Sequence, residues 1–188
     1  GVEARVASNL QPLHLSTLVG RLAFAREGSG PFVFSADQLA FTTDSNVKFG
    51  PSNLRFSLER DEAGRPVAIE TSASALEIGT LTSLSGALPL SDDVRSFLER
   101  HPLSGSIRDL ELSAEGDPTD PKNWRGSFGF YRLTLPGSPK DSLPSFRNLG
   151  GLVTARPNGD ILVDVNGPAS TFVFPGVFRH PRFQLDEL

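Results

Sequence analysis

The sequence predicts an all-β protein, built as one meandering antiparallel sheet with a single short helix. Three observations carry this prediction: apolar and polar residues alternate with a period of two in most segments, turn residues separate these segments, and only one stretch has a helical period. The chain has 188 residues, which is enough for one domain with a sizeable core. We expect about nine strands in a single β-rich segment that spans residues 1–188.

The alternation places apolar residues on one side of each predicted strand. In "NLRFSLER", at residues 53–60, every second residue is leucine or phenylalanine and the residues between them are polar. Because successive side chains of a strand point to opposite faces, such a segment has one apolar and one polar face. We call the residues that follow this rule the alternating apolar set. Its members are Leu54, Phe56, Leu58, Val67, Ile69, Leu110, Leu112, Phe128, Phe130, Ile161, Val163, Val165, Phe172 and Phe174.

The breaks between these segments have the composition of tight turns. Asp61-Glu62-Ala63-Gly64 separates two strands, and Pro157-Asn158-Gly159 separates two more. Asn and Gly accept a positive φ at little cost, so both breaks favour hairpins. Consecutive strands should therefore be antiparallel neighbours.

The predicted helix lies near residues 91–101. Ser91 is a suitable N-cap, two aspartates follow it in the first turn, and Pro102 ends the helix. The helix is too short for a helix bundle, so its apolar stripe should pack against the sheet or its end. That stripe consists of Val94, Phe97 and Leu98.

Composition argues against several classes of function. The net charge is −4 and the sequence has no block of Lys and Arg, which argues against nucleic-acid binding. There is no cysteine, so disulfides, thiolate catalysis and cysteine-ligated zinc are excluded. The three histidines, His14, His101 and His180, have no ligand-like spacing, and neither a Gly-x-Ser-x-Gly motif nor a phosphate-binding loop occurs. We expect no catalytic residues, no metal and no cofactor.

Phenylalanine dominates the aromatic residues, with 14 Phe against one Tyr and one Trp. Its side chain brings apolar area without a polar group, so it suits either a dry core or a surface that binds hydrocarbon. The first possibility is a β-sandwich whose two inner faces bury each other. In that case the chain would be a non-catalytic binding module or an architectural scaffold of a cell-envelope protein.

Three features suggest a piece of a longer, repetitive chain. The sequence has no methionine, and it ends in "FQLDEL", which follows a strand pattern without a turn. A Leu-x-Gly motif also recurs at Leu18, Leu84, Leu103 and Leu149. We therefore expect duplicated hairpin units.

Residues 84–112, "LSGALPLSDDVRSFLERHPLSGSIRDLEL", resemble the central region of the YhdP family. These are very large AsmA-like envelope proteins of Gram-negative bacteria, related in architecture to TamB. The same order continues downstream with "WRGSFGFYRLTL", a proline-rich loop, "NLGGLVTARPNGDILVDV" and "FVFPGVFRHPRFQLDEL". The resemblance covers residues 76–188, whereas residues 1–75 are similar only in general style.

The resemblance implies an elongated, curved antiparallel sheet, bent into a U-shaped trough with an apolar inner face. It also implies a periplasmic part of an inner-membrane-anchored protein that carries phospholipids toward the outer membrane and supports outer-membrane integrity. The alternating apolar set would then line the groove. Its partners would be phospholipid acyl chains and neighbouring segments of the same large chain. The family has no established catalytic residues to carry over.

Overall fold

The computed structural model describes residues 1–5, 10–26, 28, 30–88, 92–138, 143–167, 170–174 and 182–185. The helical elements are α1 (Ile78–Ser83), η1 (Ser85–Ala87), α2 (Asp92–Arg100) and η2 (Pro121–Asn123). The strands are β1 (Val2–Ala4), β2 (Leu13–Ala25), β3 (Phe32–Thr43), β4 (Lys48–Arg60), β5 (Pro66–Glu77), β6 (Ser104–Glu115), β7 (Trp124–Leu135), β8 (Ser145–Ala155), β9 (Ile161–Val165), β10 (Ser170–Val173) and β11 (Arg182–Leu185).

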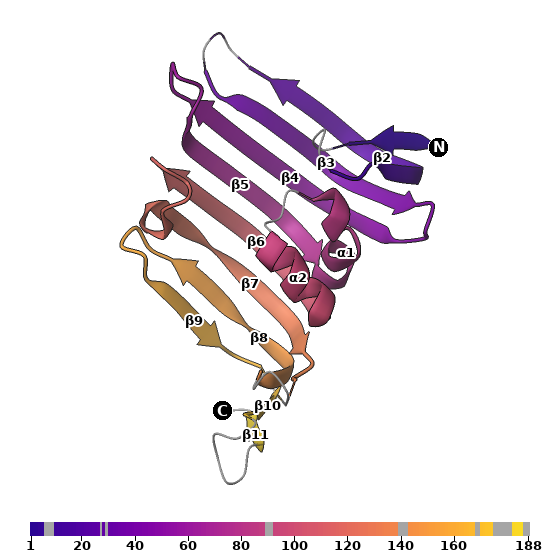
Figure 1. Ribbon diagram of the computed structural model, residues 1–188, viewed down its shortest axis with the longest axis vertical. Helices are drawn as coiled ribbons and strands as arrows, with labels where there is room; N and C mark the ends of the chain where they lie inside the picture. Colours follow the sequence, from indigo (N-terminus) through magenta and orange to yellow (C-terminus); the bar gives the residue numbers. More distant parts are fainter. Residues whose placement is uncertain are drawn as a thin grey trace.

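All strands in the described part of the chain belong to one eleven-stranded sheet. Its order is the chain order from β1 to β8, followed by β10 and β11, while β9 pairs with β8. Every pairing is antiparallel. In Figure 1 the strands lie side by side from β1 to β11, which occupy opposite ends of an open sheet. The predicted all-β, open antiparallel fold is confirmed, and it is consistent with the expected trough.

Two expectations about the fold need correction. The sandwich alternative is wrong for the described residues, because they form a single sheet and not two packed sheets. The sheet also has more strands than the roughly nine expected from alternation. β1 has 3 residues and β11 has 4, and strands so short display too few alternating positions to be detected.

The register shows that the two faces of the sheet differ in polarity. Directly paired residues of antiparallel strands point to the same face, so a row of partners can be followed across the sheet. One row runs through Phe34, Phe56, Thr71, Leu112, Gly126, Ala155 and Ile161. The adjacent row, on the opposite face, runs through Ser35, Arg55, Ser72, Glu111, Ser127, Thr154 and Leu162. We call these the apolar face and the polar face.

Bulges maintain this division along the strands. In β3 the register shifts between Ala36 and Leu39, and Gln38 between them has a φ of 52°. The extra residue brings Leu39 to the same face as Ala36, although the two residues are three apart. The N–H of Gln38 donates to Oδ1 of Asn53 at 2.8 Å, so the bulge leaves no unpaired donor there. Asp109, Arg132 and Asn148 also have positive φ values beside register shifts.

Three of the helical elements, α1, η1 and α2, lie between β5 and β6, and η2 lies between β6 and β7. The predicted helix is confirmed as α2, and α1 and η1 precede it where the sequence analysis expected no helix. Figure 1 places α1 and α2 in front of the sheet, at the end where β5 leaves it. α1 contacts β5 and β6, whereas α2 contacts α1 and η1. Ser91, the expected N-cap, lies outside the described residues.

The large buried side chains of the apolar face lie at this same end of the sheet. Leu15, Phe49, Phe130, Leu135 and Leu149 are in strand halves near the β5-to-α1 junction, whereas the small Ala36 and Ala114 are buried in the opposite halves. Phe130 is 3% exposed, whereas Tyr131, its neighbour on the polar face, is 47% exposed. The cover over Phe130 therefore lies on the apolar face, and α1 contacts β6, the strand that pairs with β7 beside Phe130.

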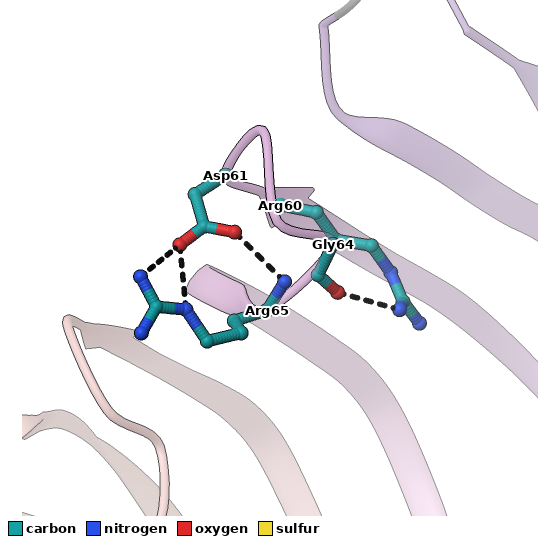
Figure 2. Close-up of polar contacts among 4 residues, drawn as sticks. All are labelled: Arg60, Asp61, Gly64 and Arg65. Atoms are coloured by element: carbon teal, nitrogen blue, oxygen red, sulfur yellow. Dashed lines mark hydrogen bonds and ion pairs between the residues drawn. The ribbon is translucent and has the colours of Figure 1, made fainter.

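The β4–β5 hairpin is closed by an acidic residue and its arginine partner (Figure 2). The carboxylate of Asp61 accepts from the backbone N–H of Arg65 at 2.9 Å and from its Nε at 2.8 Å. The hydrogen bonds from Arg65 hold the pKa of Asp61 below its usual range. On the other side of the turn, Arg60 donates to the carbonyl of Gly64 at 3.0 Å.

Replacing Asp61 with Asn should remove a pH-dependent part of the stability. A carboxyl group with a depressed folded-state pKa stabilises the fold above its unfolded pKa, and this contribution is lost as the pH falls through the folded value. We expect Asp61→Asn to lower the urea midpoint at pH 7, with the difference from the parent disappearing at acid pH, once the pH has fallen through the lowered folded-state pKa of Asp61. Urea unfolding followed by circular dichroism at both pH values measures this. A difference that persisted unchanged at low pH would assign the effect to turn geometry and not to charge.

Glycine is required where β6 and β7 approach each other. Gly126 has a φ of +135°, and an added Cβ would clash with the carbonyl oxygen of Glu111. We expect Gly126→Ala to lower the free energy of unfolding by at least about 2 kcal/mol. Gly79 in α1 has open space around its Cα, so Gly79→Ala is the matched control and should stabilise by about 0.5–1 kcal/mol. Equal effects of the two substitutions in urea unfolding would contradict this view of the β6–β7 contact.

Candidate functional site: the apolar face of the sheet

The apolar face carries most of the phenylalanine in the chain. Ten of the 14 phenylalanines occupy strand positions on this face, by direct pairing or by continuation of the alternation. Phe41 and Phe49, from neighbouring strands, stack with ring centroids 4.9 Å apart. The ten are Phe24, Phe32, Phe34, Phe41, Phe49, Phe56, Phe128, Phe130, Phe146 and Phe172. This concentration makes the face the strongest candidate for a binding surface.

The register brings the alternating apolar set together on this face. Leu54, Phe56 and Leu58 pair with β5 residues that in turn pair with Leu110, Leu112 and Ala114. Phe128 pairs with Val153, which pairs with Val163, and Phe172 pairs with Phe146. The remaining members belong to the same rows by pairing, alternation or stacking. They are Val67, Ile69, Phe130, Ile161, Val165 and Phe174.

Most side chains of the alternating apolar set are half-buried. Phe130 is the one buried member of the alternating apolar set. Its ring lies over Gly151 on β8, where an added Cβ would be 2.9 Å from Cε1 of Phe130. The β9 members Ile161, Val163 and Val165 are exposed, and the other members are half-buried. A face in this condition still has apolar area that a ligand can cover.

The alternating apolar set does not include the part of the apolar face on β2 and β3. Leu22 and Phe24 pair with Ala36 and Phe34, so they extend the face to the N-terminal edge. The spacing Phe32-x-Phe34 could have indicated this part of the face. The bulges at Gly20 and Gln38 interrupt the alternation of apolar residues along β2 and β3. Phe24 is 67% exposed and Ile161 on β9 is 66% exposed, so the apolar face is accessible at both of these edges.

The apolar stripe of α2 has a mixed environment. Val94 and Phe97 are exposed, and Leu98 is half-buried. The ring centroids of Phe97 and His101 are 5.0 Å apart. Arg95 fixes the helix to the preceding turn, because its guanidinium donates to the carbonyl oxygens of Ser85 at 3.3 Å and Leu88 at 3.4 Å. Packing of the stripe against the sheet itself stays a prediction.

The polar face has a different chemistry. Ser and charged residues alternate along β4 to β7, and Arg125 contacts both Ser113 and Glu115 on β6. These groups are exposed to solvent, so such ion pairs contribute little to stability. The polar face therefore keeps one side of the sheet hydrated, while the other side is available for apolar contacts.

Features of other site classes are few in the described part of the chain. No group of three His, Asp or Glu residues there is arranged to hold a metal ion. His14 is exposed at the start of β2, His101 is buried after α2, and His180 lies outside the described residues. No helix within the described ranges is long and apolar enough to cross a membrane.

Comparison with known proteins adds no assignment. No protein-family model, curated protein or solved structure matches the chain. The candidate site is therefore defined by its geometry and its chemistry.

Phe130 should be the most important side chain of the apolar face for stability. Phe130→Ala removes a ring that is 3% exposed, and we expect it to lower the free energy of unfolding by about 3–4 kcal/mol. Phe24→Ala, at a site that is 67% exposed, is the matched control and should cost less than about 1 kcal/mol. Urea unfolding of both variants measures the difference. Similar losses would mean that the two ends of the apolar face are buried alike.

Proposed function

We propose that the apolar face binds phospholipid acyl chains, and that the chain forms part of a non-catalytic conduit for lipids between the inner and outer membranes. The supporting observation is a continuous apolar face on an open sheet, with a polar face behind it. The resemblance to the YhdP family in residues 84–112 and in the segments that follow agrees with this proposal.

The energetics of lipid transfer favour such a surface. Transferring two acyl chains from water to an apolar environment is worth on the order of 20 kcal/mol, at about 0.8 kcal/mol for each buried CH₂. A lipid therefore needs an apolar path through an aqueous compartment. The rows of Phe, Leu, Val and Ile on the apolar face supply contacts of this kind along the whole width of the sheet.

The chemistry of the face also suits a ligand that slides. Its polar members are few, and the two most buried of them, Ser52 and Ser170, are hydrogen-bonded within the protein. Hydrophobic contacts are non-directional, so an acyl chain can move from one row to the next without breaking specific polar bonds. Absence of a fixed anchor point is an advantage for transfer and a disadvantage for tight, selective binding.

The helical elements divide the face into a covered end and an open end. Phe130 and Leu149 are buried in strand halves at the end where β5 leads into α1, whereas Phe24 and Ile161 are exposed in the opposite halves. Acyl chains would bind in the open part, and α1, η1 and α2 would limit their access to the covered part. This arrangement gives the helices a role as a wall of the groove.

The sheet edges support the proposed partners. β1 pairs only with residues 13–15 of β2, so most of β2 is an edge strand. An unpaired edge presents backbone N–H and C=O groups that another strand can pair with. Neighbouring segments of the same large chain would extend the groove there. The proposed location is periplasmic, in a protein anchored in the inner membrane.

An architectural role without lipid is the second possibility retained from the sequence. In that case the apolar face would be covered by protein and would meet no lipid. The two possibilities differ in what touches the exposed rows of the face, which a crosslinking experiment can determine.

Leu162 and Val163 provide the matched pair for this experiment. They are adjacent on β9, both are apolar, and they are 40% and 54% exposed. Leu162 pairs with Thr154 and Val163 with Val153, so they point to the polar and apolar faces. A photo-crosslinking amino acid at each position, in the whole protein in Gram-negative cells, should give a phospholipid adduct at Val163 and at least about tenfold less at Leu162.

Mass spectrometry of the crosslinked product identifies the adduct. Adducts of equal yield at both positions would indicate non-specific contact with membranes. Protein adducts at Val163 without any lipid would favour the architectural role and contradict the lipid conduit.

A further inference from the structure

The polar face has a hollow at the end of the sheet where β5 leads into α1. Its volume is about 620 Å³, and strands β5 to β8 and the residues after β9 line it. Glycine forms part of its wall at Gly105, Gly150 and Gly167, where no side chain fills the space. We propose that this hollow binds a small phosphate ester. The site is on the opposite face from the proposed lipid groove, so it is independent of that proposal.

Two arginines provide the positive charge. Arg108 from β6 and Arg132 from β7 line the hollow, together with a single carboxylate, that of Glu77. Among the residues that the structure describes, neither guanidinium forms an ion pair. The hollow is therefore locally positive on a chain whose net charge is −4. Guanidinium groups bind phosphate oxygens with charge-assisted, often bidentate hydrogen bonds.

The first of these arginines is held in place by an aromatic ring. The guanidinium carbon of Arg108 lies 5.2 Å from the ring centroid of Tyr131. The Tyr131 ring itself extends over Gly129, where an added Cβ would be 3.1 Å from Cε2 of the ring. Stacking reduces the number of orientations that Arg108 can adopt, so less entropy is lost when it binds an anion.

The second arginine is turned by a bulge. Arg132 has a φ of 50° and lies at the register shift between Phe130 and Leu133. Opposite it, Gly105 allows the two strands to approach, because an added Cβ would be 3.0 Å from the carbonyl oxygen of Arg132. Bulges re-aim side chains near binding sites, and this bulge brings Arg132 to the hollow.

Amide and hydroxyl groups complete the site. Asn148, Asn166 and Ser106 also line the hollow. The backbone positions of the two asparagines are fixed: Asn166 donates its N–H to Gly150 at 2.9 Å, and the Asn148 carbonyl accepts from Ser170 at 3.0 Å. Side-chain amides and hydroxyls pair with the hydroxyl groups of a polyol. The site thus fits a phosphate carried on a small hydroxylated molecule.

Titration of the isotope-labelled protein with sn-glycerol 3-phosphate tests the proposal. We expect saturable NMR shifts of the Gly105 and Gly150 amides. Arg132→Gln and Arg108→Gln should each weaken binding at least about tenfold. Arg21→Gln, which makes the same charge change on the polar face away from the hollow, should change the affinity less than about twofold. Circular dichroism confirms that each variant is folded.

Two sources of the phosphate ester are distinguished by a second measurement. Recruitment to vesicles that contain phosphatidylglycerol, lost in Arg132→Gln, would identify a lipid headgroup as the ligand. Binding of sn-glycerol 3-phosphate without recruitment to vesicles would identify a soluble ligand. Three results would overturn the proposal: shifts that do not saturate, an equal loss of affinity in Arg21→Gln, or equally tight binding of glycerate, which has a carboxylate in place of the phosphate.

Discussion

The structure depends on one constraint: each strand must keep its apolar side chains on the same face of a wide open sheet. Strand side chains alternate, so an irregularity of one residue would move the following apolar residues to the polar face. The bulges prevent this. At Gln38 and Arg132 the chain inserts one residue in the left-handed region, and the next apolar residue returns to the apolar face. The division into two faces therefore survives across β2 to β10.

Because the described residues form one sheet, the apolar face has no second sheet to bury it. Of the helical elements, α1 contacts the sheet at β5 and β6, and the β9 edge at Ile161 stays exposed. Each square ångström of apolar surface that leaves water contributes about 25 cal/mol, so any apolar ligand or partner that covers this face gains free energy. Fold and proposed function follow from the same feature, since a sealed sandwich would have used that free energy for its own stability.

Local alternation was sufficient to predict the class of fold and much of the candidate site. Residues 53–59 and 161–165 are paired without a register shift, and their apolar residues lie on the predicted face. Alternation does not predict the face of a side chain where a bulge interrupts the two-residue period. In β3 the apolar positions pass from even to odd numbers at Gln38, so no single alternation describes the strand. α1 was not predicted because its sequence, Ile-Gly-Thr-Leu-Thr-Ser, has low intrinsic helix propensity and depends on contacts with β5 and β6.

The same irregularities that preserve the apolar face also shape the polar one. At Arg132 the bulge returns Leu133 to the apolar face, and on the other side it brings a guanidinium to the hollow. Gly105 allows the close approach of β6 and β7, and it also lines that hollow. A sequence pattern cannot reveal such a site, because its residues come from several strands whose register depends on the bulges. The polar hollow is thus a consequence of keeping the opposite face apolar, which is why two surfaces of such different chemistry share one end of the sheet.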